Sequence, residues 1–323
     1  MQDLYGKKVL VTGVNGCIGS AAAALLAEKG FSVVGFDIQP LRKNLERFCT
    51  DNILGDITDS RQIETAVGAC DFVVHLAGWV HAVPKNEKEI RKVFEINHEA
   101  TGNLASICKI KEKRLVFAST VAVYGDEVSG TLDETTPTNP TSAYGQAKLL
   151  AERAVIEAGG VTLRLPLVYG AYDRGNMTRM IRSIRQGWFV IPSNGAAAKT
   201  FAGRWNVASA IYCALAAPRA AGEVFLVTDE ETTTLKELGD LIAEIYGCRK
   251  PLSLPSPLLT GVAAISSGIE TATGLHLPLS FASYRKLTRN LIFDGRKIRS
   301  ELGYSPLRSL KEGLEEQIEW IGR

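Results

Sequence analysis

The chain has 323 residues, a formal net charge of +2 and 46% hydrophobic residues. This length predicts one large or two modest domains with an ample core. Acidic and basic residues are interleaved, which excludes a dedicated nucleic-acid surface. No apolar run reaches the roughly 18 residues that a membrane-spanning helix requires. A strand pattern begins near Lys7 and leaves no room for a signal peptide, so we expect a cytoplasmic protein.

The six cysteines are scattered, with no CxxC pair and no other metal-ligand spacing. A reducing compartment therefore fits better than a disulfide framework, and we expect no metal site. The most apolar stretch, Pro257–Gly274, is rich in small residues and interrupted by Glu270. It predicts a packed or surface helix.

The first half of the chain alternates short apolar runs with helical patterns. Expected strands span 7–12, 32–37, 53–54, 72–76, 114–119 and 161–165, and expected helices span 18–29, 62–67, 92–109 and the segment around Tyr144. This alternation predicts an α/β fold, a Rossmann-type doubly wound parallel sheet, over residues 1–170.

After Gly170 the pattern changes to helices at 178–186, 208–217, 235–246 and 310–320 with short strands such as 223–227. Residues 171–323 therefore predict a smaller C-terminal α/β lobe that binds the substrate. Some of its elements are free to return to the main sheet, so the boundary is approximate.

A glycine-rich turn joins the first expected strand to the first helix. In TGVNGCIG (Thr12–Gly19), Gly13 permits a tight turn, Gly16 lets the backbone approach a pyrophosphate, and Gly19 permits close packing of helix on strand. The helix N-terminus offers amide groups and a partial positive charge to the phosphates. This arrangement predicts a dinucleotide site.

Asp37 ends the second strand, where an acid can hold both ribose hydroxyls of NAD and repel the additional phosphate of NADP. We therefore expect NAD, with NADP less favoured, although Arg42 and Lys43 lie nearby. Asp56 and Ile57 fall either where the adenine ring is held or in a helix-capping loop.

Tyr144 and Lys148 lie four residues apart on a predicted helix, so their side chains share one face. Tyrosine ionises near pH 10 in water. A fixed positive charge nearby favours the phenolate, so we expect Lys148 to lower the pKa of Tyr144. Together with the glycine-rich turn, the pair indicates an acid/base that accompanies hydride transfer.

Several ordered motifs give the chain a family resemblance. It resembles the extended short-chain dehydrogenase/reductases, the NAD-dependent epimerase/dehydratase family, over nearly its whole length. The segments that carry the resemblance are TGVNGCIG, VVGFDI, GDITD, HLAG, INHEATGNL, FASTVAVYG, YGQAK, RLPLVYG and the C-terminal FDGRKIRSELGYSPLRSLKEGLEEQIEW.

The resemblance implies roles for particular residues. Tyr144 is the expected catalytic acid/base and Lys148 its pKa modulator and ribose ligand. Thr120, with Ser119 as the alternative, is expected to hydrogen-bond the reacting oxygen, and Asn97 to support the active-site helix and a proton-relay water. The expected cofactor contacts also include Asn15, Cys17, Ile18, Leu76, Ala77, Gly78 and Leu167.

Within the family, the second half is most similar to UDP-sugar 4-epimerases and reductases of 4-keto-6-deoxy sugar nucleotides. Trp79, Val80 and His81 would then line the sugar pocket, and Asn176 with Arg179 or Arg182 would face the diphosphate. Departures from the family pattern are Val121 and Ala122, which argue against dehydration, and KTFAGRWN (199–206), which lacks an expected acidic pair.

Two other functions stay open. The same catalytic residues occur in hydroxysteroid and other lipid-alcohol dehydrogenases, and Pro257–Gly274 would then seat an apolar substrate or approach a membrane. A non-catalytic NAD-binding regulator is disfavoured, because it need not keep Thr120, Tyr144 and Lys148. Family members often form homodimers, which we expect here.

Overall fold

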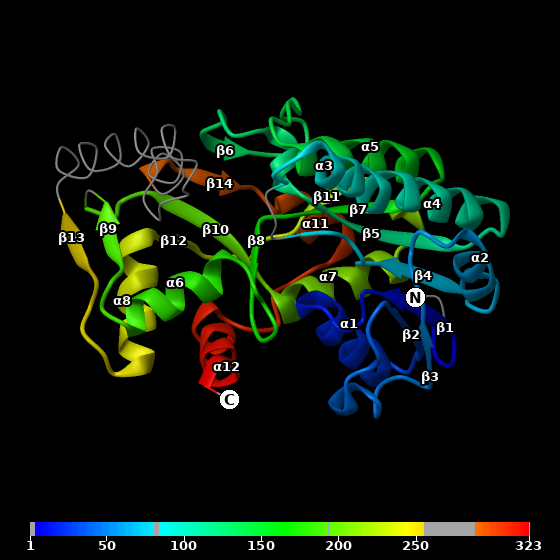
Figure 1. The fold of residues 1–323 in the computed structure, drawn as a ribbon, viewed down its shortest axis with the longest axis horizontal. Coiled ribbons are helices and arrows are strands. Elements are labelled where there is room, and N and C mark those ends of the chain that lie inside the picture. The colour runs from blue at the N-terminus through cyan, green and yellow to red at the C-terminus, as the bar shows by residue number, and fades with distance from the viewer. Residues whose placement is uncertain (1–3, 81–83, 193, 255–287, 323) are drawn as a thin grey trace.

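The computed structural model describes residues 4–80, 84–192, 194–254 and 288–322. These residues form two lobes joined side by side (Figure 1). The larger lobe is built on a parallel seven-stranded sheet with the order β11-β7-β5-β4-β1-β2-β3. Its strands are β1 (Lys8–Thr12), β2 (Ser32–Asp37), β3 (Asp51–Leu54), β4 (Phe72–His75), β5 (Arg114–Thr120), β7 (Val161–Leu165) and β11 (Val224–Leu226). The expected doubly wound α/β sheet is confirmed.

Alternate residues of each strand point to opposite faces, and two helical layers bury them. On β1, Val9 and Val11 belong to the core beneath α1 (Cys17–Glu28) and α7 (Arg204–Ala216). Leu10 belongs to the opposite core, beneath α2 (Ser60–Gly68), α4 (Ala100–Ile110) and α5 (Ala143–Glu157). Burial on both faces explains the continuous apolar runs of these strands.

The sheet extends past the expected boundary at residue 170. β11 pairs with β7, and α7 packs against α1, so residues 204–226 complete the larger lobe. The short 3₁₀ segments η1 (Lys43–Leu45) and η4 (Pro218–Ala220) connect elements of this lobe, and η3 (Val121–Tyr124) follows β5.

In the part of the chain that the structure describes, the smaller lobe holds a five-stranded sheet and three helices. The strands are β6 (Gly130–Leu132), β8 (Leu167–Tyr169), β10 (Ala198–Gly203), β12 (Thr232–Thr234) and β14 (Leu291–Phe293). β9 (Val190–Pro192) and β13 (Leu252–Leu254) form a separate parallel pair. The helices are α6 (Asn176–Arg185), α8 (Leu235–Tyr246) and α12 (Leu310–Gly322), with α11 (Arg296–Leu302) packed against β11.

Polar contacts in KTFAGRWN join the lobes in place of the missing acidic pair. The Arg204 guanidinium binds both carboxylate oxygens of Glu316 on α12, at 2.9 and 2.6 Å. Asn206 donates to the Asp229 carboxylate at 2.6 Å and accepts from the backbone amides of Leu307 and Arg308. An acid at 206 would repel Asp229, so the amide suits this buried position.

All six cysteines are free. Within the described ranges, no helix is long and apolar enough to cross a bilayer, and no group of three or more His, Cys, Asp or Glu side chains is arranged to hold a metal ion. The stretch Pro257–Gly274 lies outside the described residues.

Candidate functional site

The turn after β1 forms a close-fitting cradle at the carboxyl edge of the sheet. Gly13 has φ +69°, and a Cβ there would lie 2.8 Å from the Ala77 amide nitrogen. A Cβ on Gly19 would lie 2.1 Å from the Gly13 carbonyl oxygen, so only glycine fits this crossing of helix and strand. No side chain caps the N-terminus of α1, where Cys17 and Ile18 begin the helix. The cradle therefore fits a dinucleotide pyrophosphate.

Asp37 lies beside this cradle. Its carboxylate accepts hydrogen bonds from the backbone amides of Asn15, at 2.9 Å, and Gln39, at 3.0 Å. The Arg42 guanidinium donates to the Asn15 carbonyl at 2.6 Å and lies 3.4 Å from the centre of the Tyr172 ring. Two backbone amides thus fix the Asp37 carboxylate beside the cradle, as expected of a residue that would hold a ribose diol.

Asp56 and Ile57 serve the turn that leads into α2. The Asp56 carboxylate accepts from the amide and hydroxyl groups of Thr58, while Asp59 caps the helix. Ile57 is buried in the core beneath α2 and α4. The turn is well ordered by these contacts, and Asp56 is only half-buried, so it stays accessible to a ligand.

Helix α5 carries the expected acid/base pair. Ser142 caps the helix through the Gly145 amide, and Tyr144 follows at its first turn with its side chain partly exposed. Lys148 is buried, donates from Nζ to the Ala118 carbonyl at 2.9 Å, and lies 4.4 Å from the centre of the Phe117 ring. The structure brings Tyr144 and Lys148 to the end of β5.

The expected effect of Lys148 on Tyr144 is wrong for the protein alone. Burial raises the pKa of Tyr144 to about 12, and a hydrogen bond with Thr120 acts in the opposite direction. Burial lowers the pKa of Lys148 to about 8, while the Glu152 carboxylate raises it. For each side chain, desolvation is the larger of the two effects.

The end of β5 distinguishes Thr120 from Ser119. Ser119 turns into the core and donates to Glu152 at 2.5 Å, whereas the Thr120 side chain lies on the Tyr144 side. Arg164 on β7 binds both oxygens of Glu152 and the Tyr124 hydroxyl. The sequence analysis missed Glu152, although its position one turn after Lys148 was a usable signal.

Asn97 lies in a π-helical turn, η2 (Glu95–Glu99), between α3 (Glu87–Phe94) and α4. The expected helix 92–109 therefore starts earlier and is interrupted. Asn97 is fully buried, and its amide accepts from the Trp79 N–H at 2.9 Å and donates to the Trp79 carbonyl at 3.1 Å. A Cβ on Gly78 would lie 2.7 Å from the Asn97 oxygen. Asn97 thus fixes the backbone after β4.

A buried chain of polar groups links the cradle to this turn. Thr12 accepts from the amides of Leu76 and Ala77 and contacts His75 Nδ1 at 2.7 Å. His75 Nε2 contacts the Thr101 hydroxyl, which donates to the Asn97 carbonyl. Burial, with Lys148, lowers the pKa of His75 to about 3, so the ring is neutral. The sequence analysis did not predict this chain.

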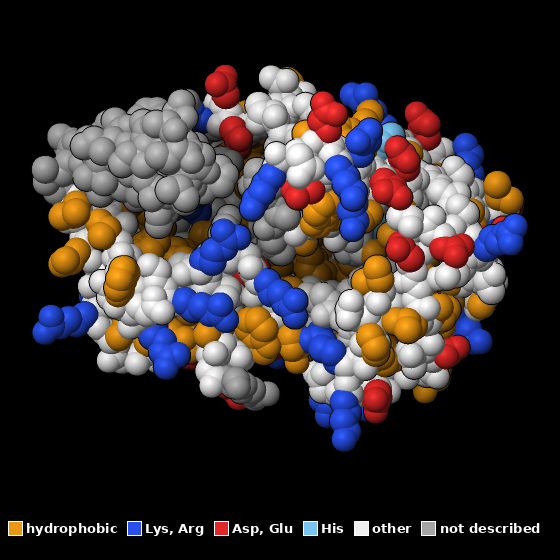
Figure 2. All heavy atoms as spheres, in the orientation of Figure 1, with side chains coloured by type: hydrophobic (Ala, Val, Ile, Leu, Met, Phe, Trp, Pro, Cys, Tyr) orange, Lys and Arg blue, Asp and Glu red, His pale blue; other side chains and the backbone are white. Residues whose placement is uncertain are grey.

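The expected substrate residues that the structure describes come from both lobes, with Trp79 after β4 and Asn176 and Arg179 on α6. Figure 2 shows a hollow between the lobes, with Lys and Arg side chains along its rim. Asn176 begins α6 and Arg179 lies one turn on, both exposed, while Leu167 on β8 is half-buried. Trp79 is half-buried with the Lys92 amine 5.3 Å from its ring centre. His81 lies outside the described residues.

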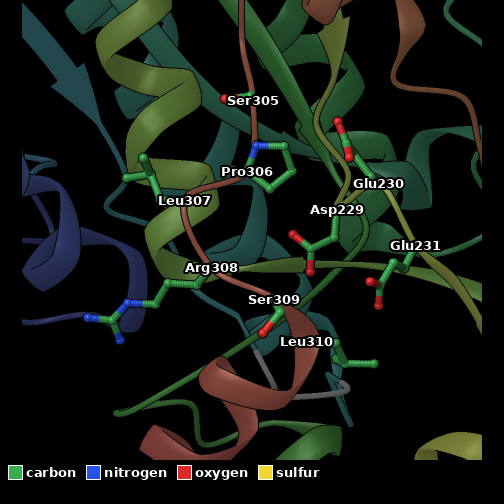
Figure 3. A pocket seen from close by; sticks show the side chains of 9 residues that line it. All are labelled: Asp229, Glu230, Glu231, Ser305, Pro306, Leu307, Arg308, Ser309 and Leu310. Atoms are coloured by element: carbon green, nitrogen blue, oxygen red, sulfur yellow. The ribbon is translucent and has the colours of Figure 1, made fainter.

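A separate cavity of about 270 Å³ lies at the start of α12 (Figure 3). Its lining comprises Asp229, Glu230, Glu231 and residues 305–310, none of which is an expected site residue. Asp229 is engaged by the Tyr169 hydroxyl and the Gly203 amide. We assign this cavity no part in the reaction.

The sheet, the glycine cradle and Asp37 together define a dinucleotide-binding enzyme of the Rossmann class. Residues 9–228 match the model of the NAD dependent epimerase/dehydratase family, and the chain belongs to that family. It is therefore an NAD-dependent enzyme of the extended short-chain dehydrogenase/reductase type.

Three known proteins illustrate the range of similarity. The chain is 25% identical to UDP-glucuronic acid 4-epimerase from Bacillus cereus, solved with NAD, with a TM-score of 0.75 and 98% of each chain covered. It is 26% identical to N-acetyl-alpha-D-glucosaminyl-diphospho-ditrans,octacis-undecaprenol 4-epimerase of Escherichia coli O157:H7, covering 97% of this chain and 94% of that protein. It is 25% identical to 3beta-hydroxysteroid-dehydrogenase/decarboxylase isoform 1 of Arabidopsis thaliana, covering 83% of this chain and 66% of that protein.

Proposed function

We propose that this protein is a 4-epimerase or 4-ketoreductase of nucleotide sugars in which Tyr144 is the acid/base. The observation that carries the proposal is the arrangement of Thr120, Tyr144 and Lys148 at the end of β5, on the edge of the sheet that also holds the glycine cradle. Similarity to a UDP-sugar 4-epimerase over 98% of both chains supports the substrate class.

The chemistry follows from where charge develops. NAD, held by the glycine cradle and Asp37, would supply a reversible hydride acceptor for the carbinol carbon. Tyr144 as phenolate removes the hydroxyl proton as the hydride leaves, and Thr120 hydrogen-bonds the same oxygen. In reduction, Tyr144 gives the proton back. Such a group contributes on the order of 10²–10⁴-fold, so positioning by α5 and β5 supplies much of the remainder.

The raised pKa of Tyr144 has a mechanistic consequence. With a pKa of about 12 in the protein alone, little phenolate exists at neutral pH. The positive charge of a bound oxidised nicotinamide, added to the Lys148 ammonium, would favour the phenolate. Tyr144 would therefore become an effective base only after the cofactor binds, which ties proton removal to the state that can accept the hydride.

On the substrate side, we assign Trp79 and His81 to the sugar pocket and Asn176 and Arg179 to the diphosphate. Asn97 supports this pocket by fixing both backbone polar groups of Trp79. Arg179 lies exposed on α6, where a guanidinium can bind phosphate oxygens. We also propose a homodimer located in the cytoplasm; sedimentation velocity and cell fractionation test these two assignments.

Net redox change distinguishes an epimerase from a reductase. The experiment mixes NAD-loaded protein with a panel of UDP-sugars, and NADH-loaded protein with their 4-keto derivatives, while nicotinamide absorbance and sugar products are followed. An epimerase gives the C4 epimer without accumulating NADH, and a reductase consumes NADH in proportion to product. If the protein converted no member of the panel, the proposed substrate class would be contradicted.

A lipid-linked sugar diphosphate is a second candidate substrate. The relative from Escherichia coli O157:H7 is named for such a substrate and matches this chain nearly end to end. A 3β-hydroxysteroid is a weaker third candidate, because that relative is matched over only 66% of its length. A polyprenyl diphosphate sugar and a sterol are therefore added to the panel. The compound that the protein turns over then distinguishes the three candidate substrate classes.

A further inference from the structure

We propose that the outer end of the smaller lobe docks on the surface of a lipid bilayer that carries anionic headgroups. The docking surface comprises Arg185, Trp188, Arg249, Lys250 and Leu252, and we call it the tip surface. It goes beyond the catalytic assignment and does not depend on it, because none of these residues belongs to the proposed active site.

Two large apolar side chains are unusually exposed at this end. Trp188 is 80% exposed and Leu252 is 72% exposed. The register of the β9–β13 pair places Leu252 beside Val190, two residues after Trp188, so both side chains lie on the same short edge. Hydrophobic side chains gather over β9 and β13 at the left end of the molecule (Figure 2). Indole rings favour the boundary between lipid and water.

Cations surround this apolar pair. Arg185 is the last residue of α6, and its guanidinium lies 5.5 Å from the centre of the Tyr246 ring at the end of α8. Arg249 and Lys250 follow α8, and both are exposed. These contacts and the chain order put positive charge from two helix ends next to the strand pair, where it complements anionic headgroups.

Acidic side chains near the tip surface are already paired with lysines. Asp240 on α8 binds Lys236 at 2.7 Å and Lys250 at 3.5 Å. Glu244, one turn later, lies 3.6 Å from the Lys311 amine. Because Asp240 offsets the charge of Lys250, the net positive charge of the tip surface comes from Arg185 and Arg249. A second copy of the protein would bring a like-charged surface against this one. Charge thus favours lipid over self-association.

An exposed indole and an exposed leucine beside basic side chains form a composition that suits the boundary between lipid and water. The tip surface lies at the outer end of the lobe, away from the hollow between the lobes (Figure 2), so docking leaves the hollow accessible.

The test is co-sedimentation of the full-length protein with vesicles of phosphatidylcholine, with and without phosphatidylglycerol. We expect binding to the anionic vesicles that weakens at high salt. Arg185→Gln with Arg249→Gln should reduce the partition coefficient at least about tenfold, because each cation near such a surface contributes about fivefold. Trp188→Ser with Leu252→Ser should reduce it similarly. Vesicle addition should shift the tryptophan fluorescence of the wild type to the blue. Loss of this shift in the variant with Trp188→Ser and Leu252→Ser would identify Trp188 as the inserted ring.

Matched variants on the other lobe are the controls. Ile110 is 80% exposed, as Trp188 is, so Ile110→Ser should leave vesicle binding unchanged. Arg61→Gln with Lys88→Gln removes two exposed charges elsewhere. No binding by the wild type, or equal losses in tip and control variants, would overturn the proposal. Self-association that Trp188→Ser abolishes would overturn it too, since a protein contact would then cover the surface.

Discussion

At the residue scale, the site depends on buried neutral polar groups that hydrogen-bond to one another. His75 is fully buried between the hydroxyls of Thr12 and Thr101. Since Thr101 donates to the Asn97 carbonyl, its oxygen accepts from His75 Nε2, which fixes the neutral ring with its proton on that nitrogen. Protonating Nδ1 as well would cost a hydrogen bond and bury a charge near Lys148.

Because the folded protein keeps His75 neutral, the free energy of unfolding should fall as the pH falls. The pKa of His75 falls from 6.5 to about 3 on folding, so the unfolded chain takes up the proton first as pH drops. Below about pH 6.5 the free energy of unfolding should decline by up to about 1.4 kcal/mol per pH unit from this residue. Urea unfolding of His75→Gln should show a shallower decline than wild type. Equal slopes in the two proteins would refute the buried neutral ring.

Glycine at the cradle offers a second residue-scale prediction. Gly19→Ala would place a methyl group 2.1 Å from the Gly13 carbonyl oxygen. The backbone must shift, so we expect a loss of about 1–3 kcal/mol in stability and weaker NAD binding by calorimetry. Gly102→Ala in α4 is the matched control: its methyl would lie 3.8 Å from Ala154, and the variant should gain about 0.5–1 kcal/mol. Unchanged NAD affinity in Gly19→Ala would contradict the assignment of this turn as the pyrophosphate-binding site.

At the element scale, three consecutive residues of β5 bind three successive turns of α5. Thr120 lies with Tyr144, Ala118 accepts from Lys148, and Ser119 donates to Glu152. Arg164 joins this pairing to β7 through a buried ion pair with Glu152, 2.9 Å long, whose side chains are 8% and 1% exposed. The ion pair between Arg164 and Glu152 therefore helps to fix the position of α5 along β5.

Breaking that ion pair should be costly. Arg164→Leu leaves the Glu152 carboxylate buried without its cation, so we expect about 3–5 kcal/mol of destabilisation in denaturant unfolding. Lys297 and Glu223 form a partly exposed pair, 2.7 Å long, and Lys297→Met should cost less than about 1 kcal/mol. If the two variants lost the same stability, Arg164 would have no special part in holding these elements together.

The sequence predicted the elements of the larger lobe well, because each buried strand or helix repeats its own apolar pattern. The bounds of β2 and β7 agree with the prediction residue for residue, as do those of α8 in the smaller lobe. It did not predict the π-helical turn at Asn97, because that turn depends on contacts with Trp79, far away along the chain. The sequence also left Ser119 and Thr120 as alternatives, since strand periodicity alone does not say which face holds Glu152.

At the scale of the whole molecule, Tyr172 connects the lobes beside the cofactor cradle. It has φ +70°, unusual for a residue with a side chain. Its ring lies under Arg42 at 3.4 Å and 5.5 Å from the Trp320 ring of α12, and its hydroxyl accepts a hydrogen bond from Asn44.

The sequence did not predict most of the short strands of the smaller lobe. Their pairing, such as that of β6 with β14, joins segments that lie far apart along the chain.

The Arg42–Tyr172 contact should couple the two lobes energetically. Tyr172→Ala keeps the positive φ, so the change in stability reports the lost ring contacts rather than relieved strain. In a double-mutant cycle with Arg42→Met, we expect a coupling energy of about 0.5–2 kcal/mol in the free energy of unfolding. Additive effects would mean that the ring and the guanidinium are merely neighbours.

The most direct test of the catalytic account is rapid-mixing absorbance of NAD-loaded protein after addition of a UDP-sugar that it turns over. Wild type should show transient reduced nicotinamide, and Tyr144→Phe should form it slower by about 10²–10⁴-fold while still retaining NAD. Tyr124→Phe, which loses a hydroxyl bound to Arg164 rather than to the reacting oxygen, should react at a rate close to wild type. Reduction of nicotinamide at the wild-type rate in Tyr144→Phe would contradict the account.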